Sequence, residues 1–295
     1  MTDFDLGRVG IWTRELDRLP MAASQAGARE LEELGYRTLW LPEVVGREPL
    51  SSAALILAGT RSLIVGTGVC NIYARSATVA QAGWKMLTEA FPDRFVLGLG
   101  VSVPPFVEGV HGRTYGPPLA TMVEYLDAMD RGVYVAARPA TERRLVLAAH
   151  RPRLLALATD RSLGSFGYFV PVAHTAWVRE LVGPDTQVLI EQAVVVESDP
   201  DVAREVARRY MATYLALPTY ADHLRRFGWT DDDLAAPSDA RVDEIVAWGA
   251  PDTIGERVRA HLDAGADHVC LQVVPADPRE VPQQAWRDLA GLTAL

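Results

Sequence analysis

One acidic residue stands where a catalytic or anchoring group would be useful. Glu43 follows the apolar, strand-like run Leu39–Leu41, separated from it only by a proline. A carboxylate in such a place can exchange protons with a ligand or hold a polar group. Glu43 is therefore a candidate catalytic residue. The plainer interpretation is that Glu43 pairs with Arg47 or Arg75 and fixes the local structure.

A histidine and an arginine follow a second apolar run. His150 and Arg151 come directly after the segment 144–149, which has the pattern of a buried strand. An imidazole titrates near neutral pH, so His150 is a second candidate for proton transfer. A guanidinium can bind a phosphate through two parallel hydrogen bonds. The alternative for His150 is an ordinary loop histidine.

Glycines near the ends of two further runs indicate a surface on which a flat molecule could lie. The runs Leu63–Cys70 and Arg94–Val101 enclose a segment with helical spacing, which predicts strand, helix, strand. Small residues at strand ends allow backbone groups to approach a ring. The glycines concerned are Gly66, Gly68, Gly98 and Gly100. Their alternative role is to form tight turns, and Val103 breaks the spacing of a dinucleotide fingerprint.

The elements that must position these residues alternate along the whole chain. Strands are expected at 8–12, 37–41, 63–70, 94–98, 144–149, 165–170, 188–196 and 268–274, with helical patterns between them. Eight such units predict a (β/α)8 TIM barrel, in which reactive groups lie at the C-terminal ends of the strands. We expect a single domain over residues 1–295. An insertion at about 218–248, between strands seven and eight, should pack on the outside of the barrel.

Composition excludes several classes of protein. The net charge is −9, and the Lys and Arg residues are scattered, so no basic patch for nucleic acid is expected. No run approaches the ~18 apolar residues of a membrane span, and the acidic N-terminus is unlike a signal peptide. These features predict a cytoplasmic protein. Cys70 and Cys270 have no partner at metal-ligand spacing, and no metal site is expected.

Taken together, the segments resemble the luciferase-like flavin and deazaflavin oxidoreductases, and among them the group that uses coenzyme F420. The resemblance covers nearly the whole chain. It depends on the order and spacing of five segments: Leu39–Glu43, Gly66–Val69, Arg94–Gly100, Ala148–Pro152 and Asp263–Asp267.

The resemblance implies a cofactor site, a small-molecule substrate and a homodimer. The implied cofactor is coenzyme F420, with FMN as the alternative. In relatives a non-prolyl cis peptide supports the central ring, and Gly68-Val69 is the matching pair. The cofactor-binding residues implied are Trp12, Thr67, Gly68, Val69, Gly98, Gly100, Ser102, Ala148, Ala149, Arg151 and Phe166. Further candidates near the barrel mouth are Tyr73, Arg75, Tyr168 and Gln272.

The chain departs from the family pattern at three places. Many deazaflavin relatives have a histidine after the acid that ends strand two and an acid after strand four, where this chain has Val44 and Val103. Small residues usually follow strand five, where this chain has His150 and Arg151. Arg151 could contact the cofactor phosphate or acidic tail, or it could crowd and weaken the site.

These departures favour reduction over alcohol oxidation, because the usual base is missing. The leading hypothesis is hydride transfer between the deazaflavin C5 and a C=C or C=N bond of a small metabolite. One alternative is an FMN-dependent monooxygenase. A third hypothesis is a degenerate barrel that binds a ligand without turnover.

Overall fold

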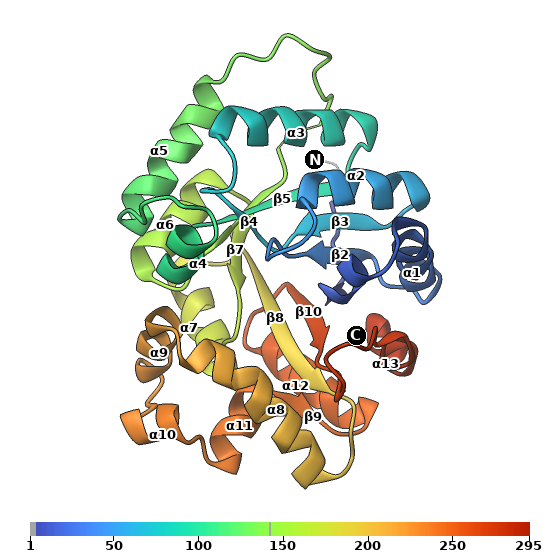
Figure 1. Cartoon of the computed structure of the whole chain (residues 1–295), viewed down its shortest axis with the longest axis vertical. Coiled ribbons are helices and arrows are strands. Elements are labelled where there is room, and N and C mark those ends of the chain that lie inside the picture. Colours follow the sequence, from blue (N-terminus) through green and yellow to red (C-terminus); the bar gives the residue numbers. More distant parts are fainter. Residues whose placement is uncertain (1–3, 142) are drawn as a thin grey trace.

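A closed parallel barrel forms the body of the molecule, and the computed structural model describes residues 4–141 and 143–295 (Figure 1). The eight barrel strands are β1 (Val9–Trp12), β2 (Thr38–Leu41), β3 (Ile64–Thr67), β5 (Phe95–Gly100), β6 (Leu145–Ala148), β7 (Gly164–Gly167), β8 (Gln187–Val195) and β10 (His268–Val273). Each pairs in parallel with its neighbour, and β10 closes the ring by pairing with both β1 and β8. The predicted (β/α)8 barrel is confirmed.

Helices connect the strands, as a parallel ladder requires. Most start where a proline or a polar N-cap makes a helix start favourable, as at Ser76, whose Oγ accepts from the Val79 N–H. The connecting helices are α1 (Met21–Glu33), α2 (Pro49–Gly59), α3 (Ala77–Ala90), α4 (Pro104–Gly109), α5 (Pro118–Arg131), α6 (Pro152–Arg161), α7 (Val172–Val182), α8 (Pro200–Leu215) and α12 (Pro251–Asp263). A helix α13 (Gln283–Asp288) follows β10. Among the described residues, no helix is long and apolar enough to span a membrane.

Alternation along the strands divides the apolar residues into two layers. Trp40, Val96, Phe166 and Leu189 fill the inside of the barrel. The residues between them, such as Leu39 and Leu97, pack against the helices. Two buried layers explain why the strands are apolar on both faces.

The third predicted strand is interrupted. β3 ends at Thr67, the Gly68-Val69 peptide is cis, and the chain resumes as β4 (Cys70–Asn71) beside β5. The sixth predicted strand is also shorter than 165–170, because β7 ends at Gly167 and Phe169 has a φ of 58°. Tyr168 therefore lies in the loop after β7, not on the strand.

The insertion between β8 and β10 contains α9 (Pro218–Arg225), α10 (Asp231–Ala235), α11 (Asp239–Ile245) and β9 (Ala247–Trp248). It has a core of its own with α8, formed by residues such as Met211, Leu224 and Trp229. Figure 1 shows these helices together at the lower left. The expectation that the insertion packs only on the outside is wrong for α9, because Tyr220 of that helix lines a cavity at the barrel mouth.

Candidate functional site

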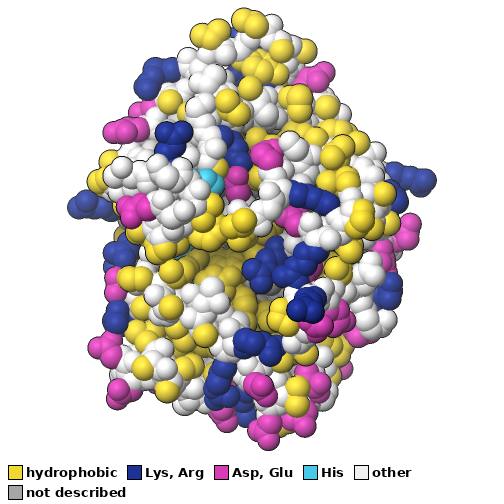
Figure 2. Space-filling view, viewed as in Figure 1, with side chains coloured by type: hydrophobic (Ala, Val, Ile, Leu, Met, Phe, Trp, Pro, Cys, Tyr) yellow, Lys and Arg dark blue, Asp and Glu magenta, His cyan; other side chains and the backbone are white. Residues whose placement is uncertain are grey.

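A cavity of ≈ 420 Å³ lies where the barrel strands end. Its volume is in the range typical of ligand sites. Figure 2 shows a hollow in this face of the molecule, with hydrophobic side chains on its floor and Lys and Arg along one edge. Of the candidate site residues predicted from sequence, those that line the cavity are Trp12, Glu43, Gly68, Val69, Gly100, Ser102, Ala148, Ala149, His150, Phe166 and Tyr168.

Gly68 and Gly100 form a glycine floor on one side of this cavity. A Cβ on Gly100 would lie 2.6 Å from Val69 Cγ2, and one on Gly68 would lie 3.0 Å from Trp12 Cδ1. The Trp12 indole N–H donates to the Gly68 carbonyl at 2.6 Å and so fixes the floor from below. A larger residue at either position would need its neighbours to move.

Thr67 and Gly98 support this floor but do not line the cavity. The Thr67 hydroxyl donates to the Gly98 carbonyl and accepts from the Gly98 N–H, each at 2.8 Å. A Cβ on Gly98 would overlap the Thr67 carbonyl oxygen. Both residues therefore lock β3 to β5, and their direct contact with a cofactor stays a prediction.

Glu43 is held by Arg75 and not by Arg47. Arg75 Nη1 donates to Glu43 Oε2 at 2.8 Å, and its Nη2 donates to Oε1. The Asn71 N–H also donates to Oε2 at 2.6 Å. The side chains of Glu43 and Arg75 are only 9% and 7% exposed. Both carboxylate oxygens are occupied, so this geometry matches the anchoring interpretation of Glu43.

Asn71, on β4, has a donor without a partner. Its Oδ1 accepts from the Tyr73 N–H at 3.0 Å, which fixes the orientation of the amide. Its Nδ2 is buried and has no hydrogen-bond partner among the described residues. Asn71 lines the cavity. Sequence reasoning did not single out this residue.

His150 lines the cavity as a neutral ring. The Tyr168 backbone N–H donates to His150 Nε2 at 3.2 Å, so that nitrogen carries no proton. Burial, with a smaller contribution from the Arg151 charge, lowers the pKa of His150 to about 4. The ring lies 4.8 Å from that of His223 on α9. A neutral imidazole with this pKa is a weak base at physiological pH.

Arg151 lies at the rim, outside the residues that line the cavity. Its side chain is 55% exposed, and its Nη2 lies 3.7 Å from Asp222 Oδ2 of α9. Arg151 therefore does not line the cavity, and its contact with a cofactor phosphate stays a prediction. The insertion holds this side chain to one side.

Three tyrosines from separate elements form a tyrosine wall, defined here as Tyr168, Tyr214 and Tyr220. All three line the cavity, and the rings of Tyr168 and Tyr214 are 5.3 Å apart. The Tyr168 hydroxyl donates to Gln272 Oε1 at 2.8 Å and lies 2.6 Å from the Tyr214 hydroxyl. Burial raises the pKa of Tyr168 well above its usual value.

Sequence reasoning missed Tyr214 and Tyr220. The segment that contains Tyr220 was expected to pack on the outside of the barrel. The spacing of Tyr210 and Tyr214, four residues apart on one helix face, was the available signal. Tyr210 also approaches Gln272 Oε1, at 3.3 Å.

A buried carboxyl group lies inside the barrel at Glu191 of β8. Its Oε2 accepts from the Phe169 N–H at 3.1 Å, and its Oε1 has no partner among the described residues. Burial raises the pKa of Glu191 to about 8. The group is thus largely protonated at neutral pH.

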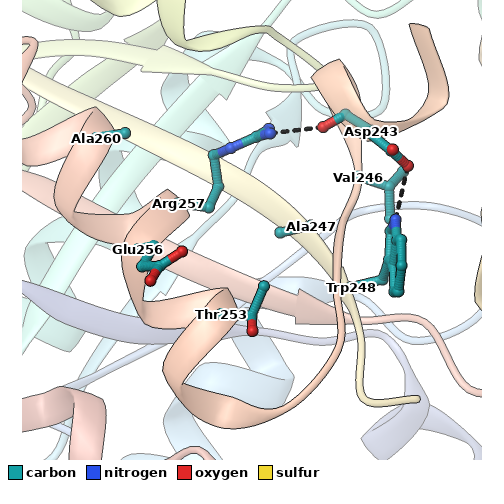
Figure 3. Close-up of a pocket in the computed structure, with 8 residues that line it drawn as sticks. All are labelled: Asp243, Val246, Ala247, Trp248, Thr253, Glu256, Arg257 and Ala260. Carbon is teal, nitrogen blue, oxygen red and sulfur yellow. Dashed lines mark hydrogen bonds between the residues drawn. The ribbon is translucent and has the colours of Figure 1, made fainter. Parts of the chain in front are cut away.

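A second cavity, of ≈ 360 Å³, lies on the outside of the barrel between α11, β9 and α12 (Figure 3). Its polar groups bond to each other. Arg257 donates to the backbone carbonyls of Asp243 and Glu244, and the Trp248 indole donates to Asp243 Oδ1 at 2.6 Å. These contacts stabilise the end of the insertion. No group of His, Cys, Asp and Glu suited to a metal ion occurs among residues 4–141 and 143–295.

Comparison with known sequences gives one family and a related protein. Residues 13–268 match the family model described as luciferase-like monooxygenase. A Mycobacterium tuberculosis protein named "Putative coenzyme F420-dependent oxidoreductase" is 33% identical over 324 residues, covering 88% of this chain and 91% of that protein.

Two solved structures have the same fold. An F420-dependent secondary alcohol dehydrogenase, solved with an F420-acetone adduct, has a TM-score of 0.77 at 13% identity and covers 97% of this chain and 98% of its own. The second is the oxygenating constituent of 3,6-diketocamphane monooxygenase from Pseudomonas putida, solved with FMN. It has a TM-score of 0.66 at 15% identity, and the match covers 97% of this chain and 96% of that one. At these identities the comparison concerns the fold alone.

Proposed function

Because the chain belongs to the luciferase-like monooxygenase family, we propose that it is an oxidoreductase that uses the deazaflavin coenzyme F420. The reaction we propose is hydride transfer to a C=C or C=N bond of a small molecule. The observation that carries the proposal is the glycine floor, where two strand ends without side chains face a cavity of suitable size. When bound, the deazaflavin supplies the hydride, at C5 of its ring.

The residues of the cavity fit a flat cofactor with carbonyl groups. A Cβ on Gly68 or Gly100 would press against Trp12 or Val69, so the bare backbone at both positions keeps this side of the cavity flat enough for a ring. The unpartnered Asn71 Nδ2 can donate to a ring carbonyl, which would remove the cost of a buried orphan donor. In this proposal Trp12, Val69, Ser102, Ala148, Ala149 and Phe166 complete the binding surface.

The other cavity residues orient and shield the reactants. The Glu43–Arg75 pair holds the loop after β2 against β4, since both carboxylate oxygens are occupied. Leu217 and Tyr220, at the start of α9, line the cavity beside the floor and would shield a bound ring from water. His150 contributes a neutral ring beside this space and Arg151 a charge at its rim.

Titration of the purified protein with oxidised F420 and, separately, with FMN tests the proposal, with ligand fluorescence as the signal. We expect F420 to bind at micromolar concentration or below. Gly100→Ala should weaken binding by roughly tenfold, because the new methyl group occupies the floor. Gly109→Ala is the matched control, since a Cβ there has nothing within 4 Å.

The titration also separates the alternatives. If FMN binds and F420 does not, a monooxygenase that consumes oxygen is favoured. This alternative is motivated by the likeness in fold to a monooxygenase solved with FMN. Binding of neither would favour a barrel that has lost its cofactor.

We also propose a homodimer that acts in the cytoplasm, as the family resemblance implies. Light scattering on the purified chain, whose monomer mass is 32.2 kDa, distinguishes a dimer from a monomer. A monomer at micromolar protein concentration would contradict the proposed homodimer.

A further inference from the structure

The hydrogen-bond directions in the tyrosine wall determine what it offers to a ligand. Gln272 Oε1 carries no hydrogen, so the Tyr168 hydroxyl must donate its proton to it at 2.8 Å. The 2.6 Å contact between Tyr168 and Tyr214 then has to use the proton of Tyr214. The Tyr214 oxygen therefore presents only lone pairs to the cavity that it lines.

Aromatic faces surround this acceptor. The rings of Trp12 and Tyr168 are 5.3 Å apart, and those of Tyr214 and Tyr220 are also 5.3 Å apart. The face of an aromatic ring attracts a cation, and the attraction is larger where water is excluded. The wall thus combines π faces with a hydrogen-bond acceptor.

The charged side chains that line the cavity are paired, while Lys and Arg lie along one edge of the hollow (Figure 2) and the charge of Arg14 acts on Tyr214. The two charged side chains that line the cavity are each paired with an opposite charge, Arg14 with Glu15 at 3.3 Å and Glu43 with Arg75. His150 is neutral. A cation would therefore meet no unpaired positive charge at the cavity wall formed by the described residues.

Within the tyrosine wall, Tyr214 comes from the helix that follows the strand opposite β3 in the barrel. In the closed ring of eight strands, β3 and β8 are four positions apart and so face each other. Gly68 directly follows β3, and Tyr214 lies on α8, the helix that follows β8. A molecule between them would have the floor on one side and the Tyr214 oxygen on the other.

We propose that the substrate of this oxidoreductase is a protonated imine, whose N–H donates to the Tyr214 oxygen while its positive charge lies against the aromatic faces. The inference rests on the proposed function and narrows its substrate class from C=C or C=N to an iminium. Addition of hydride from the reduced deazaflavin to the iminium carbon breaks the C=N π bond. The electron pair of that bond moves to nitrogen, and a neutral amine results.

This chemistry requires no proton from the protein, because the nitrogen already carries one. That agrees with the apolar Val44 and Val103, which stand where many deazaflavin relatives have a histidine and an acid and which both line the cavity. The absence of a required proton donor also agrees with the Tyr214 hydroxyl, which already donates its proton to Tyr168.

Three ring systems of nearly equal shape test the proposal by calorimetric titration of the full chain, with and without F420. They are 3,4-dihydroisoquinoline in mildly acidic buffer, where its nitrogen is protonated, N-methyl-3,4-dihydroisoquinolinium, and 1,2-dihydronaphthalene. The first has charge and N–H, the second has charge alone, and the third has neither. We expect the protonated imine to bind roughly tenfold more tightly than the hydrocarbon, and the N-methyl cation to lie between them.

Tyr214→Phe keeps the aromatic face and removes the acceptor. It should weaken binding of the protonated imine by roughly tenfold and leave that of the N-methyl cation within about twofold. Tyr134→Phe is the matched control, because Tyr134 lies in the loop after α5 and contacts Lys85 instead of the cavity. Thermal unfolding of both variants checks that they fold.

The outcomes separate the substrate class from the cofactor. Equal binding of the hydrocarbon and the protonated imine, or an equal loss for both cations in Tyr214→Phe, would overturn the inference. Failure of all three compounds to bind, while F420 binds, would overturn it and leave the proposed function intact. Preferential binding that depends on Tyr214, without any binding of F420, would support the site and contradict the proposed function. With reduced F420 present, we expect amine formation from the imine.

Discussion

The glycine floor and the tyrosine wall border the same cavity but are built in different ways. The floor is made by backbone at strand ends, where Gly98 and Thr67 exchange two hydrogen bonds and leave no room for a side chain. The wall is made by side chains from the loop after β7, from α8 and from α9, of which α9 belongs to the insertion. Changes beneath the floor should therefore reduce stability, and changes in the wall should mainly alter ligand preference.

The largest effect is expected at the ion pair beside the floor. Arg75→Met leaves the buried Glu43 carboxylate without its partner, which should lower the free energy of unfolding by about 3–5 kcal/mol. Urea denaturation measures the loss. The double variant Arg75→Met/Glu43→Leu should recover most of it, because no uncompensated buried charge remains and Glu48, the other partner of Arg75, is 46% exposed. If the double variant is as unstable as Arg75→Met alone, an unpaired Glu43 charge is not the cause of the loss.

The next effect is expected under the floor itself. Gly98→Ala forces a methyl group against the Thr67 carbonyl oxygen, so β3 and β5 must separate, and we expect a loss of about 3 kcal/mol. Gly109→Ala should stay within about 0.5 kcal/mol, since its surroundings are open. Equal stability of the two variants would contradict the idea that the floor is fixed by backbone contacts.

The sequence predicted the barrel and most of the floor residues for the same reason. The alternation of eight apolar strands with helices is a local pattern, and glycines at strand ends are visible wherever the chain is read. The cis peptide between β3 and β4 followed only from family resemblance, because no local pattern distinguishes a continuous strand from one broken at Gly68.

The wall could not be predicted in the same way. Tyr168 was expected on a strand, but the chain turns after Gly167, and Tyr220 reaches the cavity only because the insertion packs back over the mouth. Arg151 illustrates the same limit, since Asp222 of α9 holds it at the rim. Contacts made by an insertion depend on tertiary packing and not on local spacing.

Acid should affect the wall before the floor. Burial lowers the pKa of His150 to about 4 and, together with the nearby His150, that of His223 to about 2, from 6.5. The pKa of His150 is lower in the folded state than in the unfolded state. Its contribution to the free energy of unfolding is therefore complete above pH 6.5 and is lost as the pH falls from 6.5 toward 4. Each of these groups contributes a loss of up to about 1.4 kcal/mol per pH unit.

Hydrogen exchange, corrected for its intrinsic pH dependence, locates this loss. Peptides from α9 should lose protection on acidification before those from β3 and β5. His223→Phe keeps a ring against His150 but cannot titrate, so it should reduce the acid effect in α9. Simultaneous loss of protection in both regions would show that the insertion and the barrel unfold as one unit.

A pH dependence of the opposite sign is expected at Glu191, which lies inside the barrel. Burial raises its pKa from 4.5 to about 8, so the unfolded state releases this proton first as pH rises. Its contribution to stability is complete below 4.5 and is lost as pH rises through about 8. Glu191→Gln resembles the protonated acid and does not ionise in either state. Relative to the wild type, its free energy of unfolding should therefore increase by up to about 1.4 kcal/mol per pH unit between about pH 5 and pH 8. Urea midpoints of both proteins at several pH values measure this difference. A difference that does not change with pH would mean that Glu191 ionises normally inside the barrel.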